Sequence, residues 1–324
     1  MRLVVSIDTE EDNWLPYSPT GYATENAGRI PRLQRLFSEF GVRPTYLVTY
    51  QMASSQNAAA ILKEIHEAGD CEIGTHCHPW SQPPYEERHV IENSMLCNLP
   101  EELQARKIEH LHRTIQDRFG ITPTAFRSGR WGYSPAVAST LRSLNYEVDS
   151  SVTAYTDWRD CHGPDFSAIP PAPYRFDPPN VYAHKQDGPL LEVPASVSYL
   201  QRDAAFSHAV SEGIRRSPLR RLRLLGALDR LRLLNKVSLS PEMSSVADMV
   251  ALVERMRSQG HQLVTMWFHS SSLMPGLTPF VKTEEDARVF LDKIRQFLVL
   301  MRDMDVETIT LSEARLLFPA SSRQ

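Results

Sequence analysis

The sequence predicts an α/β fold, a distorted (β/α) barrel with about seven parallel strands. Short apolar runs alternate with longer amphipathic stretches along the 324 residues, and this order is typical of parallel strands joined by helical crossovers. No glycine-rich phosphate loop follows the first apolar run, which disfavours the alternative, an open doubly wound sheet. Hydrophobic residues make up 42% of the chain and charged residues 23%, as in an ordinary globular domain.

The expected strands are short runs rich in β-branched, aromatic and other apolar residues. In chain order they are residues 3–7, 45–50, 71–78, 125–128, 146–152, 190–197, 262–269 and 308–311. Longer stretches with apolar residues at helical spacing fill most of the gaps between them. These expected helices are residues 28–40, 58–68, 101–119, 134–144, 245–259 and 284–304.

Charge and cysteine content exclude several classes of protein. The chain has 35 Lys and Arg against 39 Asp and Glu, so it is not a globally basic nucleic-acid binder. None of the four cysteines forms a Cys-x-x-Cys pair, which favours free thiols. We see neither a signal-peptide pattern nor an apolar run of the ~20 residues that a membrane span needs. We therefore expect a cytoplasmic protein, with the inner face of the membrane as the alternative site.

The first expected strand ends in an acidic motif, Asp-Thr-Glu-Glu-Asp, at residues 8–12. Side chains alternate along a strand, so Asp8 and Glu10 share one face. Two adjacent carboxylates repel each other unless a proton or a cation lies between them. A solvated acidic turn explains this motif equally well when it is taken alone.

The third expected strand ends in a pair of histidines. His76 and His78 also share a face, and two imidazoles with one carboxylate form the pattern of a catalytic zinc site with an open position for water. The alternative is a pair of core histidines bonded to backbone carbonyls. A second pair, His110 and His112, lies in an expected helix, where this spacing splays the side chains apart; we expect it at the surface.

Three further polar groups follow later strands. Arg127 and Arg130 flank small residues in Arg-Ser-Gly-Arg-Trp, Asp149 precedes two serines, and His269 ends an apolar run. Each has a structural explanation of its own. Together with the acidic and histidine motifs they all fall at carboxyl ends of expected strands, where barrel enzymes place their active sites. The coincidence predicts an enzyme whose single site spans the chain, and hence one catalytic domain over residues 1–324.

These motifs, in this order, resemble those of the polysaccharide deacetylase family, also called NodB-homology or carbohydrate esterase proteins. The resemblance implies that Asp8 is the general base, His269 the general acid, and Arg127 with Asp149 a positioning pair. It also implies a divalent metal, most simply Zn²⁺, on Glu10, His76 and His78. The wording Phe-His-Ser-Ser-Ser-Leu-Met-Pro-Gly at 268–276 resembles a bacterial subgroup linked to cell-surface polysaccharide synthesis.

The chain departs from the family pattern at three places. Asp-Thr-Glu replaces two adjacent aspartates, which leaves Glu11 and Asp12 as alternative metal carboxylates. The two histidines are closer together than usual. Arg130 and Trp131 replace the usual proline and tyrosine; we expect them, with Trp80, to bind substrate, and a backbone N–H near them to stabilise an oxyanion.

The expected activity is metal-dependent removal of N-acetyl groups from an amino sugar or glycan, in cell-envelope polysaccharide metabolism. The alternative within the same class is hydrolysis of another C–N bond or of an O-acetyl ester. Trp14 and Trp267 are further aromatic candidates for stacking on a sugar.

A basic, leucine-rich stretch supports a hypothesis from another class. Residues 213–236 mix eight basic residues with leucines inside an expected helical insertion near 205–240. Such mixing is found in segments that bind anionic membranes or partner proteins, so the chain could be a membrane-associated assembly protein with a relic site. A solvated helix pair is the interpretation we favour. A proline-rich stretch near 155–189 is expected to be an irregular but ordered excursion.

Overall fold

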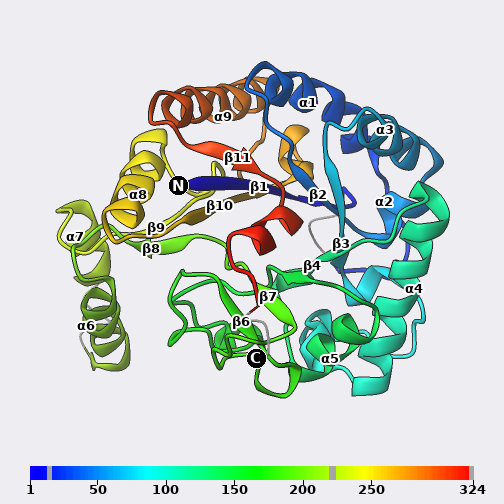
Figure 1. The fold of residues 1–324 in the computed structure, drawn as a ribbon, viewed down its shortest axis with the longest axis horizontal. Coiled ribbons are helices and arrows are strands. Elements are labelled where there is room, and N and C mark those ends of the chain that lie inside the picture. The colour runs from blue at the N-terminus through cyan, green and yellow to red at the C-terminus, as the bar shows by residue number, and fades with distance from the viewer. Residues whose placement is uncertain (13–16, 219–223, 321–324) are drawn as a thin grey trace.

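The fold is built on one curled, mostly parallel sheet (Figure 1). A computed structural model describes residues 1–12, 17–218 and 224–320. Within these residues the sheet has nine strands, and only its edge strand β6 pairs antiparallel, with β7. Eight of them follow one another across the sheet as β10 (Leu263–His269), β1 (Arg2–Thr9), β2 (Thr45–Val48), β3 (Glu72–Cys77), β4 (Ala125–Ser128), β5 (Val148–Asp149), β7 (Leu190–Glu192) and β6 (Tyr174–Phe176), while β11 (Glu307–Ile309) pairs with the start of β1.

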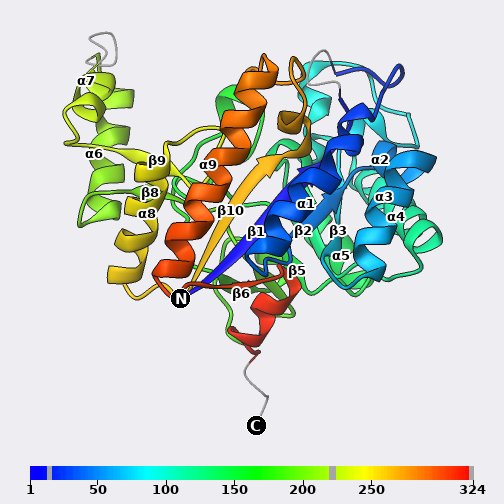
Figure 2. The ribbon, with the colours of Figure 1, turned by 90° about the horizontal axis from the view of Figure 1, so that it is seen from above.

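The strand register aligns the carboxyl ends of neighbouring strands, and the sequence motifs lie at these ends. Asp8 of β1 pairs with His269 of β10, and His76 of β3 pairs with Arg127 of β4. In Figure 2 the strands run upward from the N-terminus, so these ends and their loops lie along the upper edge. The expectation of a distorted barrel of parallel strands is confirmed, and it brings motifs from both ends of the chain to one rim.

Helices cover the outside of the sheet in an arc from α8 to α5 (Figure 1). Serine or threonine side chains cap several of them, such as Ser55, Ser134, Ser245 and Thr283, which satisfies N–H groups left open in a first turn. The helices are α1 (Ile30–Glu39), α2 (Tyr50–Ser54), α3 (Gln56–Glu67), α4 (Glu101–Phe119), α5 (Pro135–Ser143), α6 (Ala204–Arg216), α7 (Leu224–Arg230), α8 (Val246–Ser258) and α9 (Glu284–Asp303). Short 3₁₀ helices include η1 (Glu25–Arg29), η2 (Pro79–Ser81), η3 (Ile91–Ser94), η4 (Leu96–Asn98), η5 (Gly129–Trp131), η6 (Arg159–Cys161), η7 (Pro178–Asn180), η9 (Ser270–Leu273) and η10 (Ser312–Leu316).

The expected strand over 190–197 is two strands in the structure. After β7 the chain crosses to a small ribbon of β8 (Val197–Tyr199) and β9 (Lys236–Ser238), which pair antiparallel. Backbone hydrogen bonds from Ser196 N to Thr265 O (3.2 Å) and from Trp267 N to Leu239 O (3.1 Å) join this ribbon to β10. The ribbon thereby spans the side of the barrel between β7 and β10.

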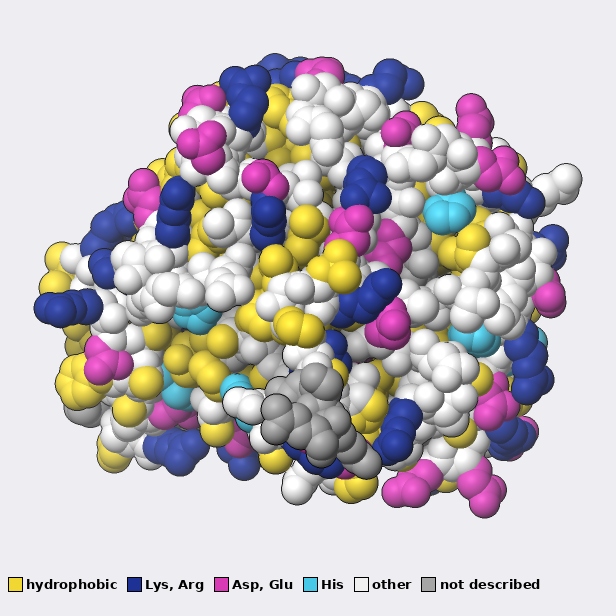
Figure 3. All heavy atoms as spheres, viewed as in Figure 1, with side chains coloured by type: hydrophobic (Ala, Val, Ile, Leu, Met, Phe, Trp, Pro, Cys, Tyr) yellow, Lys and Arg dark blue, Asp and Glu magenta, His cyan; other side chains and the backbone are white. Residues whose placement is uncertain are grey.

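The basic insertion forms α6 and α7, which lie beside α8 at the flank of the molecule (Figure 1). Arg220, Arg221 and Arg223 of the basic stretch lie outside the described residues. Among the described helices, none combines the length and the apolar character that crossing a bilayer requires. On the face shown in Figure 3, where the strands begin, acidic and basic side chains are interspersed.

Candidate active site

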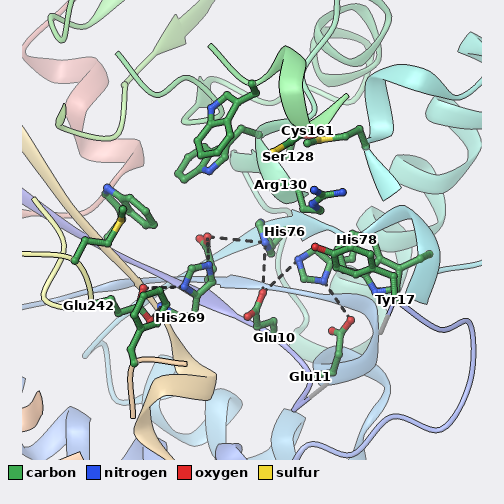
Figure 4. A pocket seen from close by; sticks show the side chains of 18 residues that line it. Glu10, Glu11, Tyr17, His76, His78, Ser128, Arg130, Cys161, Glu242 and His269 are labelled. Carbon is green, nitrogen blue, oxygen red and sulfur yellow. Dashed lines mark hydrogen bonds and ion pairs between the residues drawn. The ribbon is translucent and has the colours of Figure 1, made fainter. Parts of the chain in front are cut away.

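A pocket with a cavity volume of about 240 Å³ opens at the carboxyl ends of the strands (Figure 4). Its walls combine acidic groups, histidines and aromatic rings that come from the carboxyl ends of β1, β3, β4 and β10 and from the loops after β1, β3, β4, β5, β9 and β10. The lining residues are Asp8, Glu10, Glu11, Tyr17, His76, His78, Trp80, Met95, Ser128, Arg130, Trp131, Trp158, Cys161, Glu242, Met243, Trp267, His269 and Phe280. The predicted catalytic and metal residues Asp8, Glu10, His76, His78 and His269 therefore line one pocket together with Trp80, Arg130 and Trp131, whereas Arg127 and Asp149 do not.

The four carboxylates of the first motif have different surroundings. Asp8 and Glu10 line the pocket, as the alternation along a strand predicts. Glu11 turns to His78, with its Oε1 atom 3.1 Å from Nδ1 of the ring. Asp12 points away and accepts hydrogen bonds from the backbone N–H groups of Glu25 (2.8 Å) and Asn26 (3.1 Å) at η1. Of the three carboxylates that could ligate a metal, Glu10 is the one that meets both histidines.

Glu10, His76 and His78 form a compact buried cluster of metal-binding type. One ligand atom from each lies within 4.8 Å of the other two. The Oε2 atom of Glu10 is 3.3 Å from Nε2 of His78 and 4.0 Å from Nε2 of His76. Ser270 Oγ accepts a hydrogen bond from the Glu10 backbone N–H, and Ser271 Oγ donates to Glu10 Oε1 at 3.2 Å. The serines that follow His269 thus orient the carboxylate.

Hydrogen bonds on the far side of each ring aim the two Nε2 atoms into the pocket. His76 Nδ1 lies 3.1 Å from the backbone oxygen of Arg127, which only accepts, so Nδ1 carries the hydrogen and Nε2 keeps its lone pair. Burial lowers the pKa of His76 to about 3, and the ring is neutral. Burial also disfavours the charged form of His78, but Glu11 outweighs it and raises the pKa of that ring to about 9. Carboxylate and carbonyl partners of this kind are the usual supports of metal-binding histidines.

Asp8 is held by Arg127, whose side chain is fully buried. Arg127 Nη1 donates to Asp8 Oδ1 at 2.6 Å, and its remaining donors go to Ser6 Oγ and to the hydroxyl and carbonyl of Ser150. Burial alone would raise the pKa of Asp8, but Arg127, with His76 and His269, lowers it to about 2. Asp8 is therefore a carboxylate at neutral pH, with Oδ2 left toward His76 (4.0 Å) and His269 (3.9 Å).

His269 is paired with Glu242, a residue that the sequence interpretation missed. Glu242 Oε2 lies 2.9 Å from His269 Nδ1, its side chain is fully buried, and its Oε1 accepts from the His269 backbone N–H at 3.1 Å. Burial lowers the pKa of His269, but Glu242 outweighs it and raises the pKa to about 10. The only sequence signal for Glu242 is an acidic residue in the loop after β9, which does not by itself indicate burial.

Asp149 lies apart from this pocket. Its carboxylate accepts from the hydroxyl of Ser151 at 2.7 Å, and in the sheet it pairs with Glu192. Burial raises the pKa of Asp149. Burial and the charge of Asp149 raise the pKa of the neighbouring Glu192, so the two carboxyl groups share a proton. The Arg127 side chain donates its hydrogen bonds to Ser6, Asp8 and Ser150. The structure therefore shows a different set of contacts from the direct Asp149–Arg127 pairing that the family resemblance implies.

The other predicted histidine pair lies outside the pocket. His112 is buried, with Nδ1 3.1 Å from the hydroxyl of Tyr146, so its expected surface position is wrong. The ring of His110 packs on Tyr50, with ring centroids 5.2 Å apart. Helical spacing does direct the two rings to different neighbours, as expected.

Aromatic rings form the remaining walls. Trp80 stacks on His78 (4.2 Å between centroids) and meets Tyr17 (4.5 Å). Trp131 packs edge-on against Trp267 (5.1 Å). Rings of this size offer flat apolar surfaces on which sugar faces can stack. Trp14, a further candidate from the sequence, lies outside the described residues.

Comparison with known proteins relates the first half of the fold to a family. Residues 20–148 match the sequence model of the family described as polysaccharide deacetylase. The chain resembles the polysaccharide deacetylase family. The matched stretch includes His76, His78 and Arg127, and it ends before Glu242 and His269. No curated protein matches the chain.

Solved structures extend the similarity in fold to the whole chain. A protein from Mycobacterium smegmatis, provisionally described as a polysaccharide deacetylase, is 15% identical, with a TM-score of 0.56 over 99% of this chain and 94% of that one. A protein from Parabacteroides distasonis, provisionally described as a glycoside hydrolase/deacetylase, is 10% identical, with a TM-score of 0.60 over 98% of this chain and 72% of that one. The 4-alpha-glucanotransferase of Thermococcus litoralis is 12% identical, with a TM-score of 0.54 over 99% of this chain and 41% of that one. Part of a glucanotransferase shares the fold of this chain, so the reaction must be argued from the site.

Proposed function

We propose that this chain is a metal-dependent hydrolase that removes N-acetyl groups from an amino sugar or glycan in cell-envelope polysaccharide metabolism. The observation that carries the proposal is the Glu10–His76–His78 cluster, with the carboxylate of Asp8 and the imidazole of His269 close by. The His269 imidazole is itself paired with Glu242. The family match over residues 20–148 supports deacetylation of a carbohydrate.

The donor set fits a catalytic divalent ion, most simply Zn²⁺. Two imidazole nitrogens and one carboxylate are the ligands of many catalytic zinc sites, which keep a further position open. The three residues are buried. The atoms that do not face the cluster already have partners: His76 Nδ1 is bonded to the Arg127 backbone oxygen, His78 Nδ1 to Glu11, and Glu10 Oε1 to Ser271. When bound, such an ion supplies Lewis acidity that polarises the acetyl carbonyl and makes a water molecule more acidic.

Asp8 is proposed as the general base. Its Oδ1 atom accepts a hydrogen bond from Arg127, so the Oδ2 atom, which faces the pocket, accepts the proton of the attacking water. Arg127 keeps Asp8 ionised and fixes its orientation. A backbone N–H in the turn of Arg130 and Trp131 is the proposed donor to the oxygen that becomes negative.

His269 is proposed as the general acid. Glu242 accepts from Nδ1 and keeps the ring protonated, so Nε2 carries the proton that is given to the departing nitrogen. The C–N bond breaks, the hydroxyl of water remains on the acyl carbon, and acetate and a free amine are released. Trp80 and Trp131 are proposed to hold the sugar against these groups, and Asp149 remains a proposed positioning residue that acts at a distance on Arg127.

Hydrolysis of an O-acetyl ester, or of another C–N bond, is the alternative within this class. An amine leaves only after protonation, whereas an alkoxide is a better leaving group and depends less on the acid. A His269→Ala variant therefore separates the two reactions. Loss of amide hydrolysis by 10²-fold or more, with little change toward an ester, favours N-deacetylation.

The experiment that tests the proposal is a substrate panel with defined metal content. Protein treated with a chelator and then loaded with Zn²⁺ is incubated with N-acetylglucosamine oligomers and with O-acetylated xylan fragments. Acetate and new primary amines are measured. We expect equal amounts of both from the N-acetylated oligomers, only after metal loading. Loaded protein that releases acetate from neither class would contradict the proposal.

A further inference from the structure

Arg130 is the one Lys or Arg among the described residues that line the pocket. Four carboxylates line the same walls, and each contacts another group: Asp8 contacts Arg127, Glu11 contacts His78, Glu242 contacts His269, and Glu10 contacts His78. Each carboxylate that lines the pocket thus already has a partner, and Arg130 is an additional cation in the same wall.

The described contacts of Arg130 use little of its hydrogen-bonding capacity. Its guanidinium carbon lies 4.8 Å from the centroid of the Tyr17 ring, and Nη1 donates to the buried hydroxyl of Ser94. Among residues 1–12, 17–218 and 224–320, no carboxylate lies within 4.0 Å of this guanidinium. The three remaining segments, Asn-Trp-Leu-Pro, Leu-Arg-Arg-Leu-Arg and Ser-Ser-Arg-Gln, have no acidic side chain in sequence. A guanidinium has five N–H donors in a planar fork, so most of them remain for another partner.

The backbone that carries Arg130 is strained. Arg130 and Trp131 have φ angles of 51° and 63°, in the left-handed region that costs a side chain about 1–2 kcal/mol. The turn is pressed from both sides: a Cβ atom on Gly129 would lie 2.5 Å from the His78 ring, and one on Gly132 would lie 2.7 Å from the Leu96 nitrogen. Strained residues of this kind cluster at ligand-binding sites. Here the strained turn carries both Arg130 and Trp131 to the wall of the pocket.

We propose that Arg130 binds an anionic group of the substrate, a carboxylate or a phosphate, that lies next to the N-acetylated sugar. This inference rests on the proposed function, because it adds a recognition element to the same pocket. A planar fork matches two oxygens of a carboxylate or phosphate at once. Figure 4 shows Arg130 on the side of His78 and Tyr17, across the pocket from His269 and Glu242. The anion therefore binds away from the acid that protonates the leaving amine.

The substrate class that follows is an acidic N-acetylated glycan or a phosphorylated N-acetylated sugar. A uronic acid beside the reacting sugar supplies the carboxylate, and a sugar diphosphate supplies the phosphate. The aromatic rings of Trp80 and Trp131 hold the sugar in both cases, and the guanidinium holds the charge.

Three substrates test the proposal, of which the first two differ only in charge. The first is an oligosaccharide of alternating N-acetylglucosamine and glucuronic acid. The second is the same oligosaccharide after reduction of its carboxyl groups to alcohols, which removes only the charge. The third is UDP-N-acetylglucosamine. Each is tested by acetate release and, separately, by quenching of tryptophan fluorescence, which measures binding without turnover. The proteins are wild type, Arg130→Gln, Arg130→Lys, and Arg118→Gln as a control at the exposed end of α4.

We expect wild type to prefer at least one anionic substrate over the reduced one by 10-fold or more in kcat/KM and in Kd. Arg130→Gln should lose that preference, Arg130→Lys should keep part of it, and Arg118→Gln should keep all of it. The preferred anion tells whether the carboxylate or the phosphate is the source. The inference is overturned if wild type shows no preference for an anionic substrate, or if it binds neither of the two anionic substrates. It is also overturned if Arg130→Gln keeps the preference of wild type.

The two proposals fail separately. Acetate release without a preference for charge leaves the proposed function standing and removes the role of Arg130. Binding that depends on Arg130, without acetate release from any substrate, supports anion recognition and contradicts deacetylation.

Discussion

The two oxygens of Asp8 have different contacts in this site. Oδ1 accepts a short hydrogen bond from Arg127, and Oδ2 faces the pocket between His76 and His269. A carboxylate held in this way keeps its charge and its orientation while one lone pair remains available to a proton. The two ring nitrogens of His269 also have different contacts, because Nδ1 is bound to Glu242 and Nε2 faces Asp8 Oδ2 at 3.9 Å.

Asp8→Asn should lower kcat by about 10²- to 10⁴-fold, because an amide cannot take the proton of water. Arg127 can still donate to the amide oxygen, so the fold and metal binding should persist. Acetate release and metal content by atomic absorption measure the two effects. The control is Asp117→Asn, on the exposed surface of α4. Full activity of Asp8→Asn would show that another group is the base.

Glu242→Gln should lower kcat by about 10- to 100-fold, the usual cost of removing a group that orients a reacting histidine. Glu242 raises the pKa of His269, so the neutral replacement lowers it. In the proposed mechanism, activity needs protonated His269 and is lost as pH rises through this pKa. The basic limb of the kcat profile should therefore move to lower pH. An unmoved limb would argue against His269 as the acid; Glu254→Gln, exposed on α8, is the control.

For individual residues, the sequence pattern predicted part of the site. Alternation along a strand was enough to place Asp8 with Glu10 and His76 with His78, because each pair lies two residues apart at the carboxyl end of one strand. Glu242 was missed because it comes from a loop after an antiparallel strand, 27 residues before its partner. Burial of a lone acid in a loop depends on packing that no local pattern records.

Among the elements, the segment after β3 depends on one buried lysine. Lys107 of α4 donates to the carbonyl oxygens of Pro79 (2.9 Å), Gln82 (2.8 Å) and Pro84 (2.7 Å) and lies 3.0 Å from Glu87 Oε1. The segment includes Trp80, which stacks on His78. Lys107 therefore fixes one wall of the pocket from outside it.

Lys107→Met should lower the free energy of unfolding by about 2–4 kcal/mol, since it leaves buried carbonyl oxygens and Glu87 without their donor. Urea denaturation monitored by circular dichroism measures the change. Lys63→Met removes a partly exposed lysine from α3 and should change stability by less than about 0.5 kcal/mol. Equal effects of the two substitutions would mean that the buried contacts of Lys107 do not stabilise the segment.

Long elements were predicted closely and short ones were not. Helix α4 begins and ends where its apolar spacing indicates, with Gly120 in the left-handed conformation after it. Strands β6, β8 and β9 have three residues each, too few for periodicity to show. Their pairing is set by neighbours far away in the sequence, such as the joining of Ser196 to Thr265.

For the molecule as a whole, the pairing of β1 with β10 joins residues about 260 positions apart in the sequence. The candidate metal cluster adds a second link, between β1 and β3. A ligand that binds only the folded state stabilises it by mass action, about 2.7 kcal/mol at 100 times its Kd.

Zn²⁺ at that excess should therefore raise the midpoint of thermal unfolding by a few degrees, and Glu10→Ala should abolish the increase. Glu102→Gln, on the exposed start of α4, should retain it. Differential scanning calorimetry with and without a chelator is the measurement. An increase that persists in Glu10→Ala would place the ion elsewhere.

The α6–α7 insertion is the feature that a membrane hypothesis needs. Phe206, Leu231 and Leu233 are exposed there. Arg215 and Arg216, however, lie near Glu212, and Arg232 pairs with Asp248 at 3.0 Å. Because these charges are partly balanced, we expect no salt-sensitive flotation with vesicles of one-third phosphatidylglycerol. Flotation at low salt that is lost at high salt would support a peripheral membrane protein.

The central claim is that this site hydrolyses an N-acetyl amide with a bound divalent ion. The most direct measurement is acetate and free amine released from N-acetylglucosamine oligomers by Zn²⁺-loaded wild type beside equally loaded Asp8→Asn. We predict one amine for each acetate from wild type, and at least 10²-fold less from the variant. Wild type that binds one Zn²⁺ per chain at Glu10, His76 and His78, yet releases acetate no faster than Asp8→Asn, would contradict the account.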